Sequence, residues 1–180
     1  PSLIVDNHMI CVATINGKHY FLDPTEKYLS IGEIGTRLQG KEIMIEEGPD
    51  DYRIEKVPVS KPLEHRIERK FKLHFLNGEL AGNGQTAYFG QEKVDLLHRY
   101  HYTKMQMRNS VMKQELGQVA EKMQITNTQW PDYNDRASAL TFQFDCALKH
   151  RVSTIGHRTL VYWFPIQEFA SYELSENLIK

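Results

Sequence analysis

The stretch that decides the fold is residues 7–25, whose sequence is NHMICVATINGKHYFLDPT. Two runs rich in strand-forming residues flank Asn16 and Gly17, the pair that favours the left-handed backbone of a type I′ hairpin turn. Such a turn places Ile15 opposite Lys18 and fixes the register of the two strands. The sequence therefore predicts a tight antiparallel hairpin.

The predicted hairpin brings a histidine and an aspartate together. Side chains alternate between the two faces of a strand, so one face carries His8, Ile10, Phe21 and Asp23. His8 and Asp23 are then diagonal neighbours with backbones about 7 Å apart, within reach of a hydrogen bond. A carboxylate on one ring nitrogen orients an imidazole and leaves the other nitrogen to take a proton from a nucleophile. A surface hydrogen bond is the more common role of such a pair, and spacing alone leaves both interpretations open.

Several segments of this stretch resemble the end of a transglutaminase-like catalytic core: Asn7-His8, Asn16-Gly17-Lys18, residues 22–28 (LDPTEKY) and residues 34–41 (IGTRLQGK). They are similar in particular to Bacteroidetes proteins of this superfamily, in which the hairpin carries the His and Asp of a Cys-His-Asp triad. The resemblance implies that His8 is the general base and that Asp23 orients it. The family often has an aromatic residue two positions after the His, where this chain has Ile10. This difference concerns the shape of the substrate cleft.

The resemblance also implies a nucleophile that the chain does not supply. In this superfamily the Cys precedes the His by many tens of residues and begins a helix, whose N-terminus lowers the thiol pKa. Cys11 lies inside the first predicted strand and Cys146 lies in a late strand-like run, so both are expected to be buried structural residues. We therefore expect a C-terminal piece of a longer protein, inactive alone, whose partner is the N-terminal catalytic core. The resemblance further implies a peptide or protein substrate and a periplasmic or envelope location.

Composition narrows the remaining classes of function. The 180 residues include 22 Lys and Arg against 23 Asp and Glu, a net charge of −1 that gives no indication of nucleic-acid binding. No apolar run approaches the length of a membrane span. Two Cys cannot form a disulfide scaffold, and sequence alone does not decide whether Cys11 and Cys146 form one bridge. No cofactor motif is predicted.

The chain is predicted to have an α+β fold with mostly antiparallel strands. The expected parts are the remnant of the transglutaminase-like core (1–48), a linker with a strand (49–64), a β-rich accessory domain (65–164) and a tail (165–180). The accessory domain is expected to be an open sandwich with one long helix over 91–116 and a hairpin around Asn77-Gly78. It resembles the domain of unknown function that follows the core in the Bacteroidetes proteins, on residues 71–82 (FKLHFLNGELAG) and Arg99-Tyr100. This weaker resemblance spans about 62–165.

The apolar pattern leads to three structural expectations. The first hairpin is apolar on both faces, so the following domain or a second copy, in a homodimer, is expected to cover it. One strand over 137–148 is expected to carry Leu140, Phe142, Phe144 and Cys146 on a single face. Gly82 and Gly84 indicate a bulge or a close approach of backbone in their strand.

Two other groups of residues are candidate binding sites. His98 and His101 are three positions apart on the predicted helix, but no further metal ligands can be placed beside them, so packing or solvated histidines are the better interpretation. Trp130 and Tyr133 in a polar loop offer a surface for stacking a sugar. A loop aromatic tucked under its own turn is more common.

Two functions from different classes remain open. In the first, the parent is a papain-like cysteine acyl-transfer enzyme, a peptidase or transamidase, to which this chain contributes His8, Asp23 and an accessory domain. In the second, the chain is a non-catalytic β-rich binding or spacer module of an envelope protein, and the pair is structural.

Overall fold

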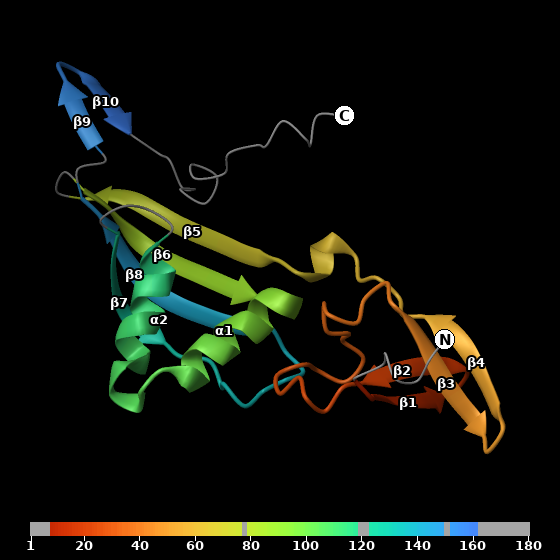
Figure 1. Ribbon diagram of the computed structural model, residues 1–180. Coiled ribbons are helices and arrows are strands. Elements are labelled where there is room, and N and C mark those ends of the chain that lie inside the picture. The colour runs from red at the N-terminus through yellow and green to blue at the C-terminus, as the bar shows by residue number, and fades with distance from the viewer. Residues whose placement is uncertain (1–7, 77–78, 119–122, 150–151, 162–180) are drawn as a thin grey trace, which may run out of the picture. The chain divides into compact units, whose positions relative to one another are not determined.

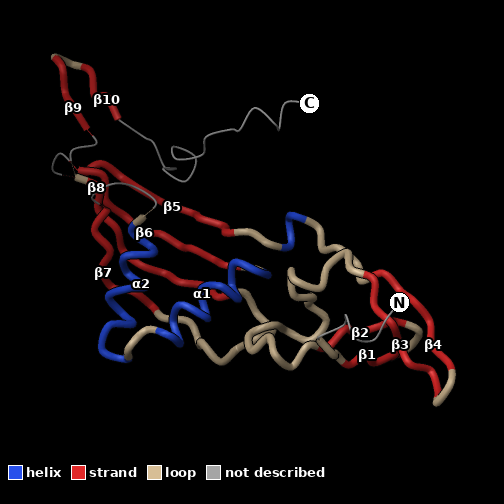
Figure 2. The backbone as a smooth tube through the Cα atoms, in the orientation of Figure 1, coloured by secondary structure: helices blue, strands red, loops and turns tan. Residues whose placement is uncertain are grey.

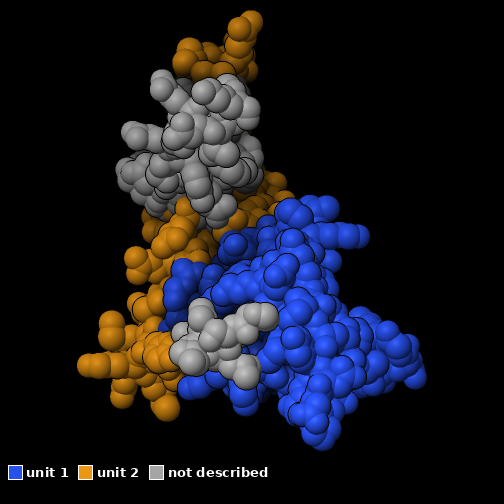
Figure 3. Space-filling view, turned by 45° about the vertical axis from the view of Figure 1, so that its right-hand side comes forward, with its two compact units in different colours: residues 1–67, 88–99, 132–140 blue, residues 68–87, 100–131, 141–180 orange. Residues whose placement is uncertain are grey.

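The computed structural model describes residues 8–76, 79–118, 123–149 and 152–161 (Figure 1). The fold is α+β with mostly antiparallel strands, as the sequence predicts. The chain divides into two compact units, each built from segments that are separate in sequence (Figure 3). Unit 1 contains residues 1–67, 88–99 and 132–140, and unit 2 contains residues 68–87, 100–131 and 141–180.

Unit 1 contains the predicted hairpin. Strand β1 (Cys11–Ile15) pairs antiparallel with β2 (Lys18–Leu22), and Ile15 lies opposite Lys18 in the predicted register. Asn16 has φ 51° and Gly17 has φ 75°, the two positive values that a type I′ turn requires. The tight turn and its register are therefore confirmed.

A second hairpin and a small apolar cluster complete the regular part of unit 1. Strand β3 (Glu42–Gly48) pairs with β4 (Asp51–Lys56) around the expected turn at 48–51, and a 3-10 turn follows at Pro62–Glu64. Phe21, Leu38 and Val57 are the buried members of the cluster. The partly buried residues packed against them are Ile10, Val12, Ile34 and Ile43.

The first hairpin was expected to be covered on both faces, and the structure differs from this expectation. Its Ile10 and Phe21 face packs on the cluster, whereas Met9, Cys11 and Ile15 on the other face are exposed, with Met9 91% accessible. Residues 24–41, which provide much of the cover, form turns rather than a helix or strand (Figure 2). In the part of the chain that the structure describes, this hairpin is therefore covered on one face, and its other face is covered only in part, at the half-buried Ala13, Tyr20 and Leu22.

Unit 2 is built on a four-stranded sheet in the order β5-β6-β8-β7. Its strands are β5 (Ile67–Leu76), β6 (Glu79–Tyr88), β8 (Leu140–Leu148) and β7 (Met123–Gln129). The residues of β8 predicted to share a face, from Leu140 to Cys146 at every second position, are all buried. The two strands β5 and β6 confirm the predicted hairpin, although its turn at 77–78 lies outside the described residues. A separate hairpin joins β9 (Val152–Ile155) to β10 (Arg158–Val161).

The two glycines of β6 let neighbouring atoms lie close to the strand. Of the two expected roles, a bulge or a close approach, the structure shows the close approach. A Cβ on Gly82 would lie 2.0 Å from the backbone oxygen of Lys72. A Cβ on Gly84 would lie 2.3 Å from the ring of Phe144. Neither space can hold a methyl group, so glycine is required at both positions for packing.

The expected single helix over 91–116 is wrong, because the chain forms two helices. Helix α1 (Gly90–Tyr102) ends before a 3-10 turn at Met105–Met107, and helix α2 (Arg108–Gly117) follows (Figure 2). Lys104 has an extended backbone, with φ −55° and ψ 136°. The Arg108 side chain donates to the carbonyl oxygens of Thr103 and His101, at 3.1 and 3.3 Å, and so satisfies groups that a helix end leaves open. Its guanidinium also stacks 4.6 Å from the ring centroid of Tyr100.

The division into units also differs from the expected boundary at 49–64. Residues 88–99 and 132–140, which the sequence assigns to the accessory domain, are part of unit 1. The reason is a set of contacts that these two segments make with the loop after Asp23, described below.

Candidate functional site

His8 and Asp23 meet as the hairpin register predicts. The Nε2 atom of His8 lies 2.8 Å from Oδ2 of Asp23, just beyond the ends of the β1–β2 ladder. The side chain of Asp23 is only 2% exposed, and that of His8 is 36% exposed. A buried carboxylate thus holds an imidazole that is still accessible from solvent.

Asp23 is held by two further hydrogen bonds from one residue. Its Oδ1 atom accepts from the backbone nitrogen of Thr25 at 2.9 Å and from Thr25 Oγ1 at 2.7 Å. Burial raises the pKa of the Asp23 carboxyl, but the hydrogen bonds from Thr25 and His8 outweigh it, so the pKa lies below the ordinary value. The carboxylate is therefore ionised and fixed in orientation at neutral pH.

This arrangement determines which nitrogen of His8 is available. Nε2 is the atom that contacts the carboxylate, so it carries the proton in the neutral ring. Nδ1 forms no hydrogen bond with any residue that the structure describes. An imidazole in this state can accept a proton at Nδ1, and Asp23 stabilises the imidazolium that results.

The two cysteines do not join the pair. Both are free thiols, so no bridge links Cys11 and Cys146. Cys146 is buried in β8, where burial and the nearby Asp145 carboxylate raise its pKa to about 11. Cys11 is exposed, which corrects the expectation that it is buried, and it lies on the hairpin face opposite to His8. Neither position suits a thiolate that reacts with substrate beside His8.

Sequence reasoning missed a buried lysine that holds the loop after Asp23. The side chain of Lys93 in α1 is 3% exposed. Its Nζ donates to Ser30 Oγ at 2.9 Å and to the backbone oxygen of Arg136 at 2.8 Å, and it lies 3.5 Å from Oε1 of Glu33. Ser30 Oγ also donates to the Arg136 oxygen. This Lys93 cluster ties three distant segments of unit 1 together.

Tyr28 makes a second link between the same segments. Its buried ring packs edge to face against His98 of α1, with centroids 4.6 Å apart, and the Arg136 guanidinium lies 4.8 Å from its centroid. His98 is thus a packing histidine, as expected. Together with the Lys93 cluster, this contact explains why 88–99 and 132–140 belong to unit 1.

The remaining binding candidates do not gain support. Among the described residues, no group of His, Cys, Asp or Glu is arranged to hold a metal ion. The ring of Trp130 packs edge to face against the buried Phe142, with centroids 6.2 Å apart, and Tyr133 Oη is buried. Both aromatics are half-buried, and their contacts are with the fold itself.

Of the site residues that sequence reasoning missed, Thr25 is the one that local sequence could have revealed. An Asp followed two residues later by Thr is typical of a side chain that accepts from its own backbone in a turn. The Lys93 cluster has no such signal, because its residues lie in three segments far apart in the chain. In comparisons with known proteins, no family model, no curated protein and no solved structure matches this chain.

Proposed function

We propose that His8 and Asp23 are the general base and its orienting carboxylate in a cysteine acyl-transfer site of the transglutaminase-like kind. The observation that carries this proposal is the 2.8 Å contact between His8 Nε2 and the buried carboxylate of Asp23. The partial exposure of His8 supports it, because a base must reach its substrate. The resemblance of residues 7–41 to the end of such a core supplies the reaction class.

In the proposed reaction, Nδ1 of His8 takes the proton of a thiol, and the thiolate attacks the carbonyl carbon of an amide. The imidazolium then protonates the departing amine, and the acyl group stays on sulfur as a thioester. Water or a second amine then attacks the thioester while His8 accepts its proton. The carbon–sulfur bond breaks, the acyl group passes to the water or amine, and the imidazolium returns the proton to the departing thiolate. Throughout, Asp23 keeps the ring oriented and stabilises its positive charge.

The thiol must come from outside these 180 residues, since neither Cys11 nor Cys146 fits the role. The exposed apolar face of the first hairpin, with Met9 and Ile15, supports a catalytic core as the partner. The proposed substrate is a peptide or protein amide, and the proposed location is the periplasm or cell envelope, both from the resemblance. No described helix combines the length and apolar character that crossing a bilayer requires.

Thiol labelling of the longer protein that contains this chain tests the proposal. We expect an iodoacetamide fluorophore to label a Cys upstream of Pro1 faster than the exposed Cys11, and His8→Ala to reduce the rate at that upstream Cys at neutral pH by about tenfold or more. His19→Ala is the matched control, because His19 lies on the same hairpin and bonds Thr14 instead of Asp23. Equal labelling in His8→Ala and the unmodified protein would refute the base assignment.

The second candidate, a non-catalytic module with a structural pair, makes the opposite prediction. There, His8→Ala would lower the free energy of unfolding while the longer protein showed no Cys with raised reactivity. The observation that keeps this candidate is the firm anchoring of Asp23 by Thr25, which would suit a purely structural hydrogen bond. Measuring labelling and unfolding on the same variants separates the two functions.

A further inference from the structure

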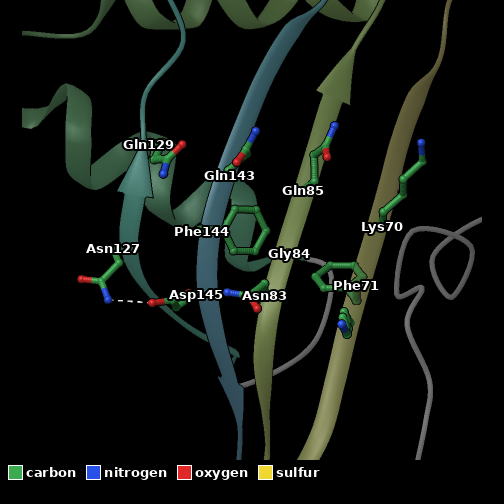
Figure 4. Close-up of a pocket in the computed structure, with 11 residues that line it drawn as sticks. Lys70, Phe71, Asn83, Gly84, Gln85, Asn127, Gln129, Gln143, Phe144 and Asp145 are labelled. Carbon is green, nitrogen blue, oxygen red and sulfur yellow. Dashed lines mark hydrogen bonds between the residues drawn. The ribbon is translucent and has the colours of Figure 1, made fainter.

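A polar groove of about 370 Å³ lies over the four-stranded sheet of unit 2 (Figure 4). This volume falls within the range of about 300–1,000 Å³ that is usual for ligand pockets. All four strands contribute to it, so it crosses the sheet instead of following one edge. Its polar lining contains five carboxamides and one carboxylate: Asn83, Gln85, Asn127, Gln129, Gln143 and Asp145.

Asp145 fixes two of the carboxamides. Asn83 Nδ2 donates to Oδ1 of Asp145 at 2.7 Å, and Asn127 Nδ2 donates to Oδ2 at 2.6 Å. Asn127 has φ 46°, a left-handed conformation that Asn tolerates better than most residues. Each Asn therefore keeps its carbonyl oxygen and a second N–H in a defined position, so that part of the groove is organised before any ligand arrives.

Three glutamines form a row beside Asp145 and its two asparagines; we call it the glutamine row. Gln129 and Gln143 are partners in the β7–β8 register, and Figure 4 shows Gln85 next to them on β6. The side chains of Gln85, Gln129 and Gln143 form no hydrogen bond with any residue that the structure describes. Each offers both donors and an acceptor, so the row can exchange hydrogen bonds with a ligand that carries both kinds of group.

The lining disfavours a peptide as the ligand. Strands β6 and β8 are central in the sheet, so their backbone groups are already paired and cannot accept an added strand. The aromatic residues at the floor face the core: Phe144 is buried, and Phe71 packs against it with ring centroids 6.2 Å apart. At its centre the groove therefore offers no free sheet edge, and its two aromatic rings pack against each other.

The charges disfavour a polyanion. Lys70 and Lys72 on β5 are the two cationic residues of the lining, and Asp145 is its one carboxylate. Binding to nucleic acid usually requires many cationic contacts along the backbone of the ligand. A groove whose hydrogen-bonding groups are mostly neutral amides instead matches a neutral ligand with many hydroxyl groups, each of which is both donor and acceptor.

We propose that this groove binds a neutral oligosaccharide. In the complex, hydroxyl groups of the sugar donate to the carbonyl oxygens of Asn83 and Asn127 and accept from the free amides of the glutamine row. The open shape and the lack of a stacking aromatic make the complex weak, with a dissociation constant on the order of 1 mM or somewhat lower. This site is independent of His8 and Asp23.

Calorimetric titration of the full chain with neutral hexasaccharides tests the proposal, with cellohexaose, chitohexaose and maltohexaose as probes. We expect saturable binding of at least one probe, weakened about tenfold by Gln143→Leu and by Asn83→Leu. Gln114→Leu is the matched control, because Gln114 is exposed on α2, outside the groove. Circular dichroism of each variant confirms that it is folded.

The salt dependence distinguishes a neutral ligand from an anionic one. For the proposed site, the dissociation constant changes less than about twofold between about 50 and about 500 mM NaCl. Absence of binding to all three probes, or binding that both groove variants leave unchanged, would overturn the proposal. A strong loss of affinity at high salt would also overturn it, since that would indicate anion binding at Lys70 and Lys72.

Discussion

At position 23 the chain buries a carboxylate and still favours its ionised form. The opposing effects are burial, which raises the pKa, and three hydrogen bonds, which lower it more. Two of these bonds come from Thr25, so the local turn does as much to stabilise the charge as His8 does. The folded chain itself thus fixes the orientation of this carboxylate.

The lowered pKa of Asp23 makes the stability of the fold depend on pH. Because the folded pKa lies below the unfolded value of about 4, its contribution to the free energy of unfolding is present above about pH 4 and is lost as the pH falls through the folded pKa. We expect the unmodified chain to lose more stability than Asp23→Asn between about pH 5 and about pH 2.5. Urea unfolding followed by circular dichroism measures the difference.

A second acidic group must be considered in that comparison. Asp135 also has a lowered pKa, mainly from hydrogen bonds with Ser138 and Ala137, and it is present in both proteins. Its effect cancels when the two pH profiles are subtracted. Identical profiles for the unmodified chain and Asp23→Asn would contradict the assigned shift at Asp23.

Lys93 is the residue whose loss should affect unit 1 most clearly. Lys93→Met keeps the length of the side chain but removes the hydrogen bonds to Ser30 and to the Arg136 carbonyl. We expect the free energy of unfolding to fall by about 2 kcal/mol, since buried polar partners lose a charged donor. Urea unfolding measures this change. Lys113→Met, at an exposed position of α2, is the control and should change stability by less than about 0.5 kcal/mol.

The elements show where local sequence rules suffice. The first hairpin and its register follow from Asn16-Gly17, and the buried face of β8 follows from alternation at Leu140 to Cys146. These features depend on neighbours in sequence or on a period of two, which sequence displays directly. The contact of His8 with Asp23 was predictable for the same reason.

The break between α1 and α2 shows where such rules fail. No Gly or Pro marks residues 103–104, and the apolar pattern continues through them. The break depends on Arg108, whose side chain returns to the carbonyls of His101 and Thr103 and to the ring of Tyr100. These contacts are part of the tertiary structure, so the helical periodicity of the sequence does not indicate the break. The Lys93 cluster was missed for the same physical reason.

The turn of the first hairpin gives a prediction at the scale of the element. Gly17 has φ 75°, and no atom lies within 4 Å of the place that an alanine methyl would occupy, so Gly17→Ala tests backbone strain alone. We expect it to lower the free energy of unfolding by about 1 kcal/mol. Gly48→Ala is the control, since Gly48 also has open space around it but lacks a positive φ, and thermal unfolding compares the two. Equal effects would show that the type I′ geometry carries no cost.

At the scale of the whole molecule, the discontinuity of unit 1 changes how the chain can be divided. The segment with His8 and Asp23 lies in residues 1–67, but the loop after Asp23 is anchored by Lys93 and His98 from α1 and by Arg136. The part that the sequence predicts to be an accessory domain therefore supplies buried contacts to the unit that carries the candidate site. Variation in 88–99 or 132–140 is expected to affect that site through the loop after Asp23.

This dependence predicts the behaviour of a truncated chain. A polypeptide of residues 1–67 keeps both hairpins and the cluster of Phe21, Leu38 and Val57, but it loses the partners of Ser30 and Tyr28. Two-stranded hairpins with so small a core are marginal in water, so we expect this polypeptide to be unfolded whereas the full chain unfolds cooperatively. Dispersion of the amide proton shifts and the near-ultraviolet circular dichroism of the tyrosines distinguish the two outcomes. A truncated chain with native shifts for His8, Asp23 and Tyr28 would show that unit 1 does not need its distant segments, and the role assigned to Lys93 would fail with it.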